Sequence, residues 1–600
     1  MKNWLLILSF LFTVSATAQD GNYDAFLARQ FALNGEYGKA AEYYADLFEQ
    51  TPDEYYNDYL DVLIKLKDFE KAEKVIKTIY KKSGNNPVYL TDIASLYLQQ
   101  EKTAEAEKQF AKIIKELPAS KYIITQVAQR LIELKQHDYA EKAYLRGKEI
   151  LKDKNAFNLE IAQLLLWKND YTGMMMAYLD EAPYMANNLS VIQNGLQKGW
   201  TDEKAKDALE KELLKRTQSA KGNFVYQDLL VWLYMQRNDF DGAVIQAKSL
   251  DMLRNEDGSN VLRIGQTALV QKDYDAAIKA FQYVVQKGAN YPWFVNANLA
   301  LINAQRDKLV NATAYQRAQL IALKGTYQTF IQSYPNDYLA TNATLELAQL
   351  EALYLHELDS AIARTLPIAE NNRTPKDLLA RAKLNLGDYY IMDEQPWESL
   401  LLYSQVEKEQ KGNPMGEEAK FKNAKLAYFK GDFEWAQTQL KIIKASTTEL
   451  ISNDAIDLSV FILDNLNTDE SDRALLKFAK SELLRYQHKL KDAEDTLNDI
   501  LATSVGTALQ DDILYLKYQL AKDRQQYAEA AGYLEQLSAS FGDDILGDNA
   551  LFYLGDLYQY YLKDEEKAKQ YYERIILEYK DSTLAVEARK RFRKLRGDIP

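Results

Sequence analysis

The chain has 600 residues, and 87 acidic residues against 74 basic ones give it a formal net charge of −13. Its hydrophobic share of 47% excludes wholesale disorder. With 24 glycines and 11 prolines, roughly half the usual share, turns are too few for a typical β-sandwich. The absence of cysteine excludes disulfides, thiolate metal sites and cysteine nucleophiles, and the acidic balance argues against a general nucleic-acid-binding protein. Composition therefore favours a large all-helical protein that binds rather than catalyses.

The N-terminus has the pattern of a secretory signal peptide. Lys2 precedes an apolar stretch over residues 4–14, and Ala16-Thr17-Ala18 is a small-residue cleavage site. An uncleaved anchor is the alternative, but 11 apolar residues are fewer than the about 20 that cross a bilayer. The junction Ala18-Gln19 lacks the lipidated cysteine of a lipoprotein, and a chain without disulfides suits a bacterial periplasm better than eukaryotic secretion. We therefore expect cleavage after Ala18 and a periplasmic or secreted protein that is not a lipoprotein.

A small residue recurs along the first half of the chain with a period near 34, and a large residue follows most of these positions by four. The recurring positions are Ala40, Ala72, Ala106, Ala140, Met174, Ala208, Ala243 and Ala277. Asp-aromatic pairs such as Asp68-Phe69 and Asp273-Tyr274 come just before several of them. This spacing resembles that of the tetratricopeptide repeat, in which a small residue on the second helix of a hairpin lets the first helix approach closely. The resemblance implies an all-α, right-handed superhelix of stacked helical hairpins.

A second series of such positions has a period near 37. It consists of Ala361, Ser399, Ala436, Ala493, Ala530 and Ala568. The step of 57 between the third and fourth members predicts one extra helix, within residues 453–480. We therefore predict four parts: a signal peptide (1–18), an N-terminal repeat array (19–292), an irregular helical junction (293–340), and a C-terminal repeat array (341–600) that ends in a basic capping helix.

Residues 550–592 carry the sharpest repeat pattern, with Leu554-Gly555, Tyr558, Ala568 and Tyr572 at the expected spacing. This segment is similar to the bacterial periplasmic repeats of the Tol-Pal cell-division coordinator and of the outer-membrane assembly lipoprotein. The lipoprotein has a lipidated cysteine that this chain lacks, and the resemblance supplies no binding residues to transfer. It implies a protein partner in the cell envelope.

Candidate catalytic groups are few. His137, His356 and His488 lie far apart in the sequence, each near a turn or a helix end, so we interpret them as isolated turn or surface residues. The pairs Asp511-Asp512 and Asp543-Asp544 precede predicted helices, and we interpret them as helix caps. No phosphate-binding glycine loop, nucleophile elbow or zinc-protease motif is present in the sequence. We therefore expect no enzymatic activity, no cofactor and no metal.

Two surfaces are candidates for binding a partner. The polar inner face of the first repeats would place Arg29, Asn57, Asp61 and Gln129 in a groove for an extended peptide or a protein loop. The C-terminal run 589–596 reverses the overall acidic balance. We favour a solvated capping helix for this run, and docking on lipid headgroups or an acidic partner is the alternative. Its basic residues are Arg589, Lys590, Arg591, Arg593, Lys594 and Arg596.

The sequence therefore predicts a periplasmic tetratricopeptide-repeat scaffold for protein–protein interaction, in assembly or maintenance of the cell envelope near the outer membrane. Its expected partners are envelope proteins, without nucleic acid and without a membrane span after signal cleavage, although peripheral membrane contact is compatible with the basic run. The alternative is a glycan-binding protein of a nutrient-import system, since such proteins are also built on tetratricopeptide helices. Those proteins carry a lipidated cysteine and long loop insertions, whereas this sequence has no cysteine and few long non-repeat segments.

Overall fold

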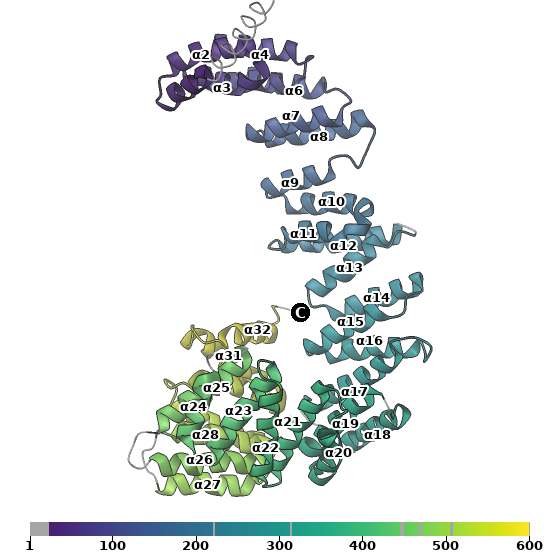
Figure 1. The fold of residues 1–600 in the computed structure, drawn as a ribbon, viewed down its shortest axis with the longest axis vertical. Coiled ribbons are helices and arrows are strands. Elements are labelled where there is room, and N and C mark those ends of the chain that lie inside the picture. The colour runs from purple at the N-terminus through teal and green to yellow at the C-terminus, as the bar shows by residue number, and fades with distance from the viewer. Residues whose placement is uncertain are drawn as a thin grey trace, which may run out of the picture. The chain divides into compact units, whose positions relative to one another are not determined.

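A computed structural model describes residues 23–219, 222–312, 315–335, 337–443, 449–466, 471–503 and 508–598. Within these ranges the protein contains helices and turns and no strand, so the predicted all-α class is confirmed. Consecutive helices pack as antiparallel pairs, which makes the fold a helical-hairpin solenoid (Figure 1). The predicted signal peptide lies outside the described residues.

The chain forms two compact units, Met1–Arg254 and Asn255–Pro600. In the first unit, residues 23–33 are helical and precede α2. The helices that follow are α2 (Tyr37–Gln50), α3 (Pro52–Lys65), α4 (Phe69–Lys82), α5 (Val88–Gln99), α6 (Thr103–Lys115), α7 (Lys121–Glu133), α8 (His137–Leu151), α9 (Asn158–Trp167), α10 (Tyr171–Glu181), the 3-10 helix η1 (Ala182–Asn188), α11 (Leu189–Gln197), α12 (Glu203–Ser219), α13 (Val225–Gln236) and α14 (Phe240–Arg254).

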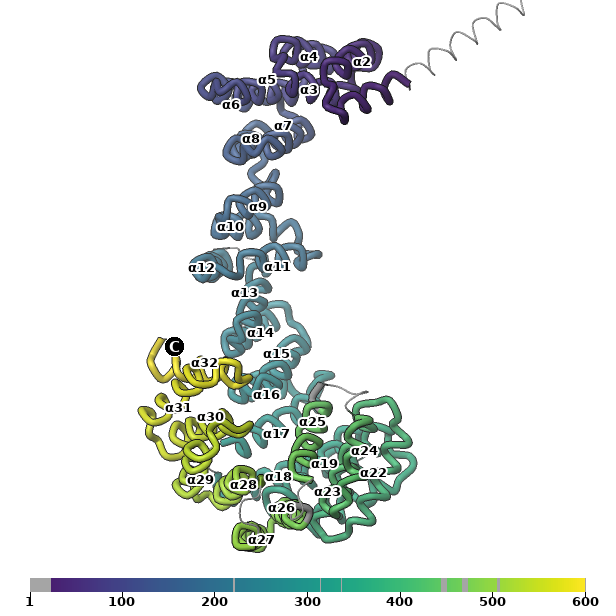
Figure 2. Tube along the Cα trace, turned by 90° about the vertical axis from the view of Figure 1, so that its left-hand side faces the viewer, coloured from purple at the N-terminus to yellow at the C-terminus, as the bar shows by residue number. Residues whose placement is uncertain are grey.

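The second unit continues the pairing and follows a curl (Figure 2). Its helices are α15 (Ser259–Val270), α16 (Tyr274–Gln286), α17 (Phe294–Val310), α18 (Arg317–Ser333), α19 (Tyr338–Leu350), the π-turn η2 (Glu351–Leu355), α20 (Leu358–Glu370), α21 (Lys376–Met392), α22 (Pro396–Glu409), α23 (Pro414–Phe429), α24 (Phe433–Ile443), α25 (Glu449–Asn465), α26 (Ser471–Tyr486), α27 (Leu490–Thr503), α28 (Gln510–Asp523), α29 (Tyr527–Ser540), α30 (Gly547–Asp556), the π-turn η3 (Leu557–Tyr561), α31 (Glu565–Glu578) and α32 (Ala585–Arg596). The predicted junction 293–340 holds α17, α18 and the start of α19, and the proposed array boundaries stay a prediction.

Most hairpins share one kind of turn, in which a single left-handed residue ends the first helix. These residues are Gly35, Lys67, Glu101, Lys135, Asn169, Asn238, Lys272, His356, Glu394, Gly431, His488, Gln525 and Lys563. The next residue is the N-cap of the second helix, and where it is aspartate its carboxylate accepts a backbone N–H three residues on. Asp68 accepts from Lys71 at 3.1 Å, and Asp273 accepts from Ala276 at 3.1 Å. The recurrent Asp-aromatic pairs in the sequence therefore mark helix starts.

The small residue that defines the repeat lies four positions after the N-cap and is fully buried in every hairpin except one. The exception is the unit marked by Ala208, where the predicted position is wrong. There Asp202 caps the helix, and the backbone N–H of Lys206, four residues later, donates to its carbonyl. Ala208 is only half-buried, whereas Ala205 is fully buried. In α12 the cap therefore comes two residues earlier than the repeat phase predicts, and the buried small residue comes three residues earlier.

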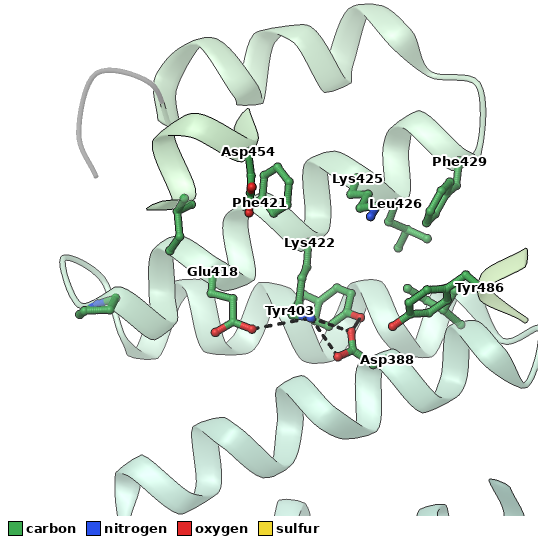
Figure 3. Close-up of a pocket in the computed structure, with 13 residues that line it drawn as sticks. Asp388, Tyr403, Glu418, Phe421, Lys422, Lys425, Leu426, Phe429, Asp454 and Tyr486 are labelled. Atoms are coloured by element: carbon green, nitrogen blue, oxygen red, sulfur yellow. Dashed lines mark hydrogen bonds and ion pairs between the residues drawn. The ribbon is translucent and has the colours of Figure 1, made fainter. Parts of the chain in front are cut away.

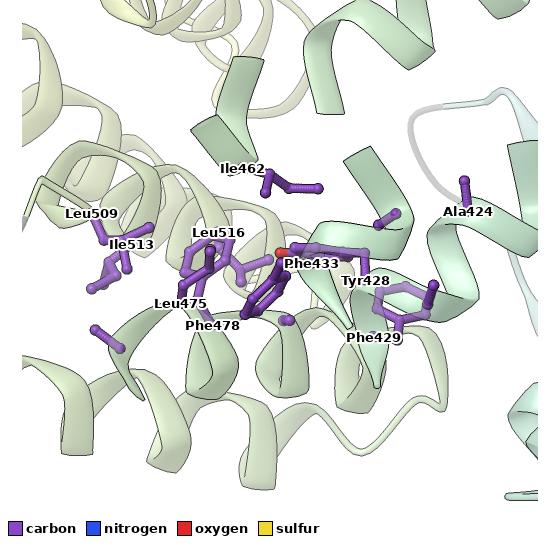
Figure 4. Close-up of a cluster of buried hydrophobic side chains, with 14 of the residues drawn as sticks. Ala424, Tyr428, Phe429, Phe433, Ile462, Leu475, Phe478, Leu509, Ile513 and Leu516 are labelled. Carbon is purple, nitrogen blue, oxygen red and sulfur yellow. The ribbon is translucent and has the colours of Figure 1, made fainter. Parts of the chain in front are cut away.

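Helix α25 is the extra helix that the 57-residue step predicts. It lies between the α23–α24 and α26–α27 hairpins and has no hairpin partner of its own. Its Ile462 enters a hydrophobic cluster with Tyr428 of α23, Phe433 of α24 and Phe478 of α26 (Figure 4). This shared core holds α25 against the stack as an addition to the regular repeat.

Candidate functional site

A pocket of about 510 Å³ opens in the second unit where α25 is added to the stack (Figure 3). It is lined by Asp388, Ile391, Tyr403, Pro414, Glu418, Phe421, Lys422, Lys425, Leu426, Phe429, Ile451, Asp454 and Tyr486. Seven of these come from α23 at spacings of three and four residues, so one face of α23 forms the central wall. Helices α21, α22, α25 and α26 supply the other walls.

A charged cluster forms one side of the pocket. The Lys422 ammonium donates to both carboxylate oxygens of Asp388 at 2.9 Å and lies 3.7 Å from the Glu418 carboxylate (Figure 3). The Tyr403 hydroxyl donates to Asp388 at 2.6 Å. Because burial and the Asp388 carboxylate both raise the pKa of Tyr403, this phenol stays a neutral donor. Burial opposes the charge on Lys422, but Asp388 outweighs it and raises the pKa of this lysine. Lys422 is therefore a paired, structural cation.

The rest of the lining is largely apolar and holds a second lysine. Leu426 and Phe429 of α23 lie on the side of Tyr486, and Phe421 lies on the side of Asp454 (Figure 3). Lys425 is half-buried, and its ammonium lies 5.6 Å from the centroid of the Phe429 ring. Among the described residues, no hydrogen bond or ion pair of this ammonium is found. Its electrostatic partner is Glu482, whose pKa burial raises and the Lys425 charge lowers, so the ammonium keeps its hydrogen-bonding capacity for a ligand.

The arrangement suits binding rather than bond-breaking chemistry. An apolar wall beside a cation that forms no hydrogen bond or ion pair among the described residues can receive an apolar side chain that lies next to one carboxylate. Asp454 of α25 is exposed at the rim, where it would repel further acidic groups of a ligand. Across the part of the chain that the structure describes, no group of three or more histidines and acids is placed to hold a metal ion. None of the helices described is long and apolar enough to cross a membrane.

The predicted groove residues of the first unit are all exposed. Arg29 lies in the helical segment 23–33 with its guanidinium 3.8 Å from the carboxylate of Asp58. Asn57 and Asp61 lie on α3, where Asp61 pairs with Lys65 at 2.7 Å. Gln129 lies on α7. No contact among the described residues joins these four side chains, and their role in binding stays a prediction.

The basic residues of α32 fall into two groups. Arg591 is half-buried, pairs with Asp556 and with Glu587 at 3.0 Å, and lies 4.7 Å from the centroid of the Phe552 ring. It therefore fixes α32 to the preceding hairpin. Arg596 pairs with Asp598. The others are exposed on the outer face of the helix: Arg589, Lys590, Arg593 and Lys594.

The structure corrects two interpretations made from the sequence. His356 and His488 are not isolated, because their ring centroids lie 4.4 Å apart. Each occupies the left-handed position of a hairpin turn, and two turns far apart in the sequence meet. The position of Asp511 and Asp512 is corrected in part: the N-cap of α28 is Leu509, and the two acids lie in the first turn, still at the helix start as predicted. Burial is the main cause that raises the pKa of Asp512 to about 8, and the acids Asp511 and Glu482 add to it.

The pocket itself was missed, because sequence reasoning treated each hairpin as a copy of the next. Two signals point to it. The 57-residue step marks the place where α25 enters, and apolar and charged residues alternate at three- and four-residue spacings along 414–429. A solvent-facing polar helix would lack this run of aromatic residues on the same face as its lysines.

Comparison with known proteins supports the repeat architecture in one hairpin. The tetratricopeptide repeat family model matches residues 549–582, which contain α31 and nearly all of α30. A search of curated proteins found no match. Solved structures that resemble the chain include Naa15/Naa10 bound to HypK-THB (14% identity, covering 92% of this chain and 95% of that one, TM-score 0.27).

Two further structures are similar at the same low level. One is a tetratricopeptide repeat protein from Parabacteroides merdae ATCC 43184, with 11% identity, 50% of this chain and 99% of that one covered, and a TM-score of 0.27. The other is the APC/C hetero-tetramer Cut9-Hcn1, with 11% identity, coverage of 97% and 98%, and a TM-score of 0.25. TM-scores this low carry no argument about this chain. The family model does, and it shows that residues 549–582 are a tetratricopeptide repeat.

Proposed function

We propose that the protein is a scaffold that binds other proteins and that the pocket between α21, α23, α25 and α26 receives a side chain of the partner. The observation that carries this proposal is the Lys425 ammonium, for which no hydrogen bond or ion pair is found among the described residues, against the apolar side chains of Phe421 and Phe429. Solenoids of helical hairpins present extended surfaces, and buried aromatic anchors supply much of the affinity at such interfaces.

The chemistry of the pocket defines the segment it would take. Lys422 is already neutralised by Asp388, so Lys425 is the cation left for a partner's acidic group. The apolar wall favours an aromatic or branched aliphatic side chain next to that acid. We therefore propose an acidic, apolar peptide segment as the ligand.

The setting we propose is the bacterial cell envelope. The support is the predicted signal peptide and the resemblance of residues 550–592 to repeats of two periplasmic proteins, and the function there would be assembly or maintenance near the outer membrane. Fractionation of cells that express the full chain checks this part by itself: recovery in the periplasmic fraction agrees with it, and recovery with the cytoplasm contradicts it.

The exposed face of α32 supports a second contact. Arg589, Lys590, Arg593 and Lys594 recur at three- and four-residue spacings, so they share one side of the helix. We propose that this face docks on an acidic partner or on anionic headgroups, where each added cation strengthens attachment by about 1 kcal/mol.

A site-specific experiment tests the pocket. A photo-crosslinking amino acid at Phe421 would be irradiated in living cells, and the captured proteins identified by mass spectrometry. We expect a consistent set of partners that disappears with Lys425→Glu. The matched control is Lys411→Glu, which makes the same charge change at an exposed position outside the pocket. Equal capture by both variants, or stabilisation by oligosaccharides with no protein captured, would contradict the proposal.

A further inference from the structure

Two hairpin turns far apart in the sequence meet at the rim of the second unit. His356 ends η2, and His488 follows α26. Their ring centroids lie 4.4 Å apart with an interplanar angle of 66°, an edge-to-face contact. Both residues remain partly open to solvent, so protons reach both rings.

Neighbouring residues tie the same turn to a third hairpin. The Gln487 side chain donates to the backbone carbonyl of Ile391 at 2.9 Å, and Lys489 pairs with Glu394 in the turn before α22. We call this set the turn clasp: His356, Ile391, Glu394, Gln487, His488 and Lys489. It joins the α19–α20, α21–α22 and α26–α27 hairpins.

The turn clasp adjoins the pocket. Ile391 lines the pocket with its side chain and accepts the Gln487 bond with its carbonyl. Tyr486, which lines the facing wall, directly precedes Gln487. A movement of the α26–α27 turn away from α21 would therefore separate two walls of the pocket.

Several charges surround the two imidazoles. Partial burial and the Arg317 guanidinium of α18 lower the pKa of His356, and partial burial together with His356 lowers the pKa of His488. Asp523 of α28 opposes the shift at His488 but is itself paired with Arg485 at 2.7 Å. The remaining charged neighbours are Glu357, which pairs with Lys324 and faces Arg317, and the Lys489–Glu394 pair. No acid in this set is left unpaired to stabilise a second imidazolium.

We infer that acidification opens the turn clasp and, through it, loosens the pocket, so that the scaffold holds its partner less tightly at low pH. The inference rests on the proposed function only for its last step. Two imidazolium ions in contact repel each other, whereas two neutral rings, or one neutral and one charged, remain packed. Because both histidines titrate less readily in the closed state, closure is fully stable above their unperturbed pKa and weakens as pH falls below it.

Paramagnetic labels would measure the opening directly. The sequence has no cysteine, so Asp359→Cys and Lys491→Cys, both exposed positions beside the two turns, accept labels without background. We expect one short label-to-label distance near about pH 7.5 and loss of that population near about pH 5. The same labels on His356→Gln/His488→Gln should give a distance that does not change with pH. An unchanged distance in the native pair, or an equal change in the glutamine variant, would overturn the clasp.

A second measurement separates the clasp from the pocket. The single variant Lys425→Cys would be alkylated with a maleimide at both pH values, with and without the two glutamine substitutions. At each pH, the alkylation rate in the background with both histidines is divided by the rate in the background with both glutamines, which cancels the thiol's own pH dependence. We expect this ratio to rise several-fold on acidification. If the labels move apart while the ratio stays constant, the clasp opens without loosening the pocket, which overturns that part of the inference. If the label distance and the alkylation ratio both change with pH, but Lys425→Glu does not reduce photo-crosslinking from position 421, the proposed function is contradicted and the turn clasp is not.

Discussion

The second unit contains the same polar cluster twice, once beside a pocket and once in a sealed junction. In the first, Tyr403 of α22 and Lys422 of α23 both bond to Asp388 of α21. In the second, Tyr572 of α31 donates to Asp556 of α30 at 2.8 Å, and Arg591 of α32 pairs with the same carboxylate. Both aspartates follow a Leu-Gly pair, Leu386-Gly387 and Leu554-Gly555, so they occupy the same place in the repeat.

The difference lies in what comes next along the stack. After the first cluster, α25 enters and the walls part around a cavity of about 510 Å³. After the second, the Arg591 guanidinium covers the Phe552 ring at 4.7 Å and α32 closes the core. The Tyr-Asp-cation cluster is therefore a joint between repeats, and the pocket arises from the inserted helix.

Replacing the aspartate at the centre of a cluster should have the largest effect on stability. Asp388→Ala removes the acceptor of the buried Tyr403 phenol and leaves Lys422 with Glu418 at 3.7 Å, so we expect it to lower the free energy of unfolding by about 3 kcal/mol. Asp556→Ala should cost less, because Tyr572 keeps Gln559 at 2.9 Å and Arg591 keeps Glu587 at 3.0 Å. Denaturant titration would measure this. Only Asp388→Ala should also reduce photo-crosslinking at Phe421. Equal loss of capture in both variants would mean that the pocket depends on overall stability instead of local geometry.

The two glycines test how closely each joint is packed. A Cβ on Gly387 would lie 2.4 Å from the Tyr403 ring, and one on Gly555 would lie 2.5 Å from the Tyr572 ring. We expect either alanine variant to cost about 1–3 kcal/mol, because the ring must leave its place. Gly532→Ala is the control, since a Cβ added there would have nothing within 4 Å and the substitution should stabilise α29. If Gly387→Ala leaves the free energy of unfolding unchanged while Gly555→Ala lowers it, the Tyr403 ring beside the pocket can move aside and the Tyr572 ring in the sealed junction cannot.

Asp512 should make the region next to the pocket sensitive to high pH. Its folded-state pKa of about 8 lies above the usual value, so its contribution to stability is present at low pH and is lost as pH rises through about 8. Asp512→Asn removes this penalty. The variant should therefore unfold at a higher denaturant concentration than the native chain above about pH 8, with the gap narrowing toward about pH 4. A gap that does not depend on pH would assign the effect to packing.

The basic helix should show the smallest effect on folding. Lys590→Ala touches only the exposed face of α32, so the denaturation midpoint should stay unchanged. Arg591→Ala, in the joint, should lower the free energy of unfolding by about 1–2 kcal/mol. Binding to vesicles that contain anionic lipid should weaken with Lys590→Ala, and a variant that binds as the native chain does would remove this face from the proposal.

Periodicity predicted the regular part of the molecule well. The small residues Ala40 to Ala568 mark buried helix crossings because the close approach of two helices excludes larger side chains, which is a local rule. The 57-residue step predicted α25 for the same reason. The departure at Ala208 was missed, because alanine is common enough to occupy the expected position while Ala205, three residues earlier, is the buried one.

The site could not be predicted, because it depends on contacts between distant repeats. Tyr486 meets the pocket from α26, and His488 meets His356 across more than a hundred residues. Such long-range contacts depend on the curvature of the stack of hairpins, and the spacing of small residues does not determine that curvature. A pair of histidines at equivalent turn positions was visible in the sequence, but nothing there placed the two turns together.

The inserted helix leaves the stack around it continuous. Tyr428 and Phe429, at the end of α23, contact Glu482 and Tyr486, at the end of α26, so these two helices pack directly and in parallel. Helix α25 is thus added to one side of an unbroken series of joints. Scaffolds that differ only in the inserted helix α25 would therefore bind different partners, while every other repeat keeps its sequence.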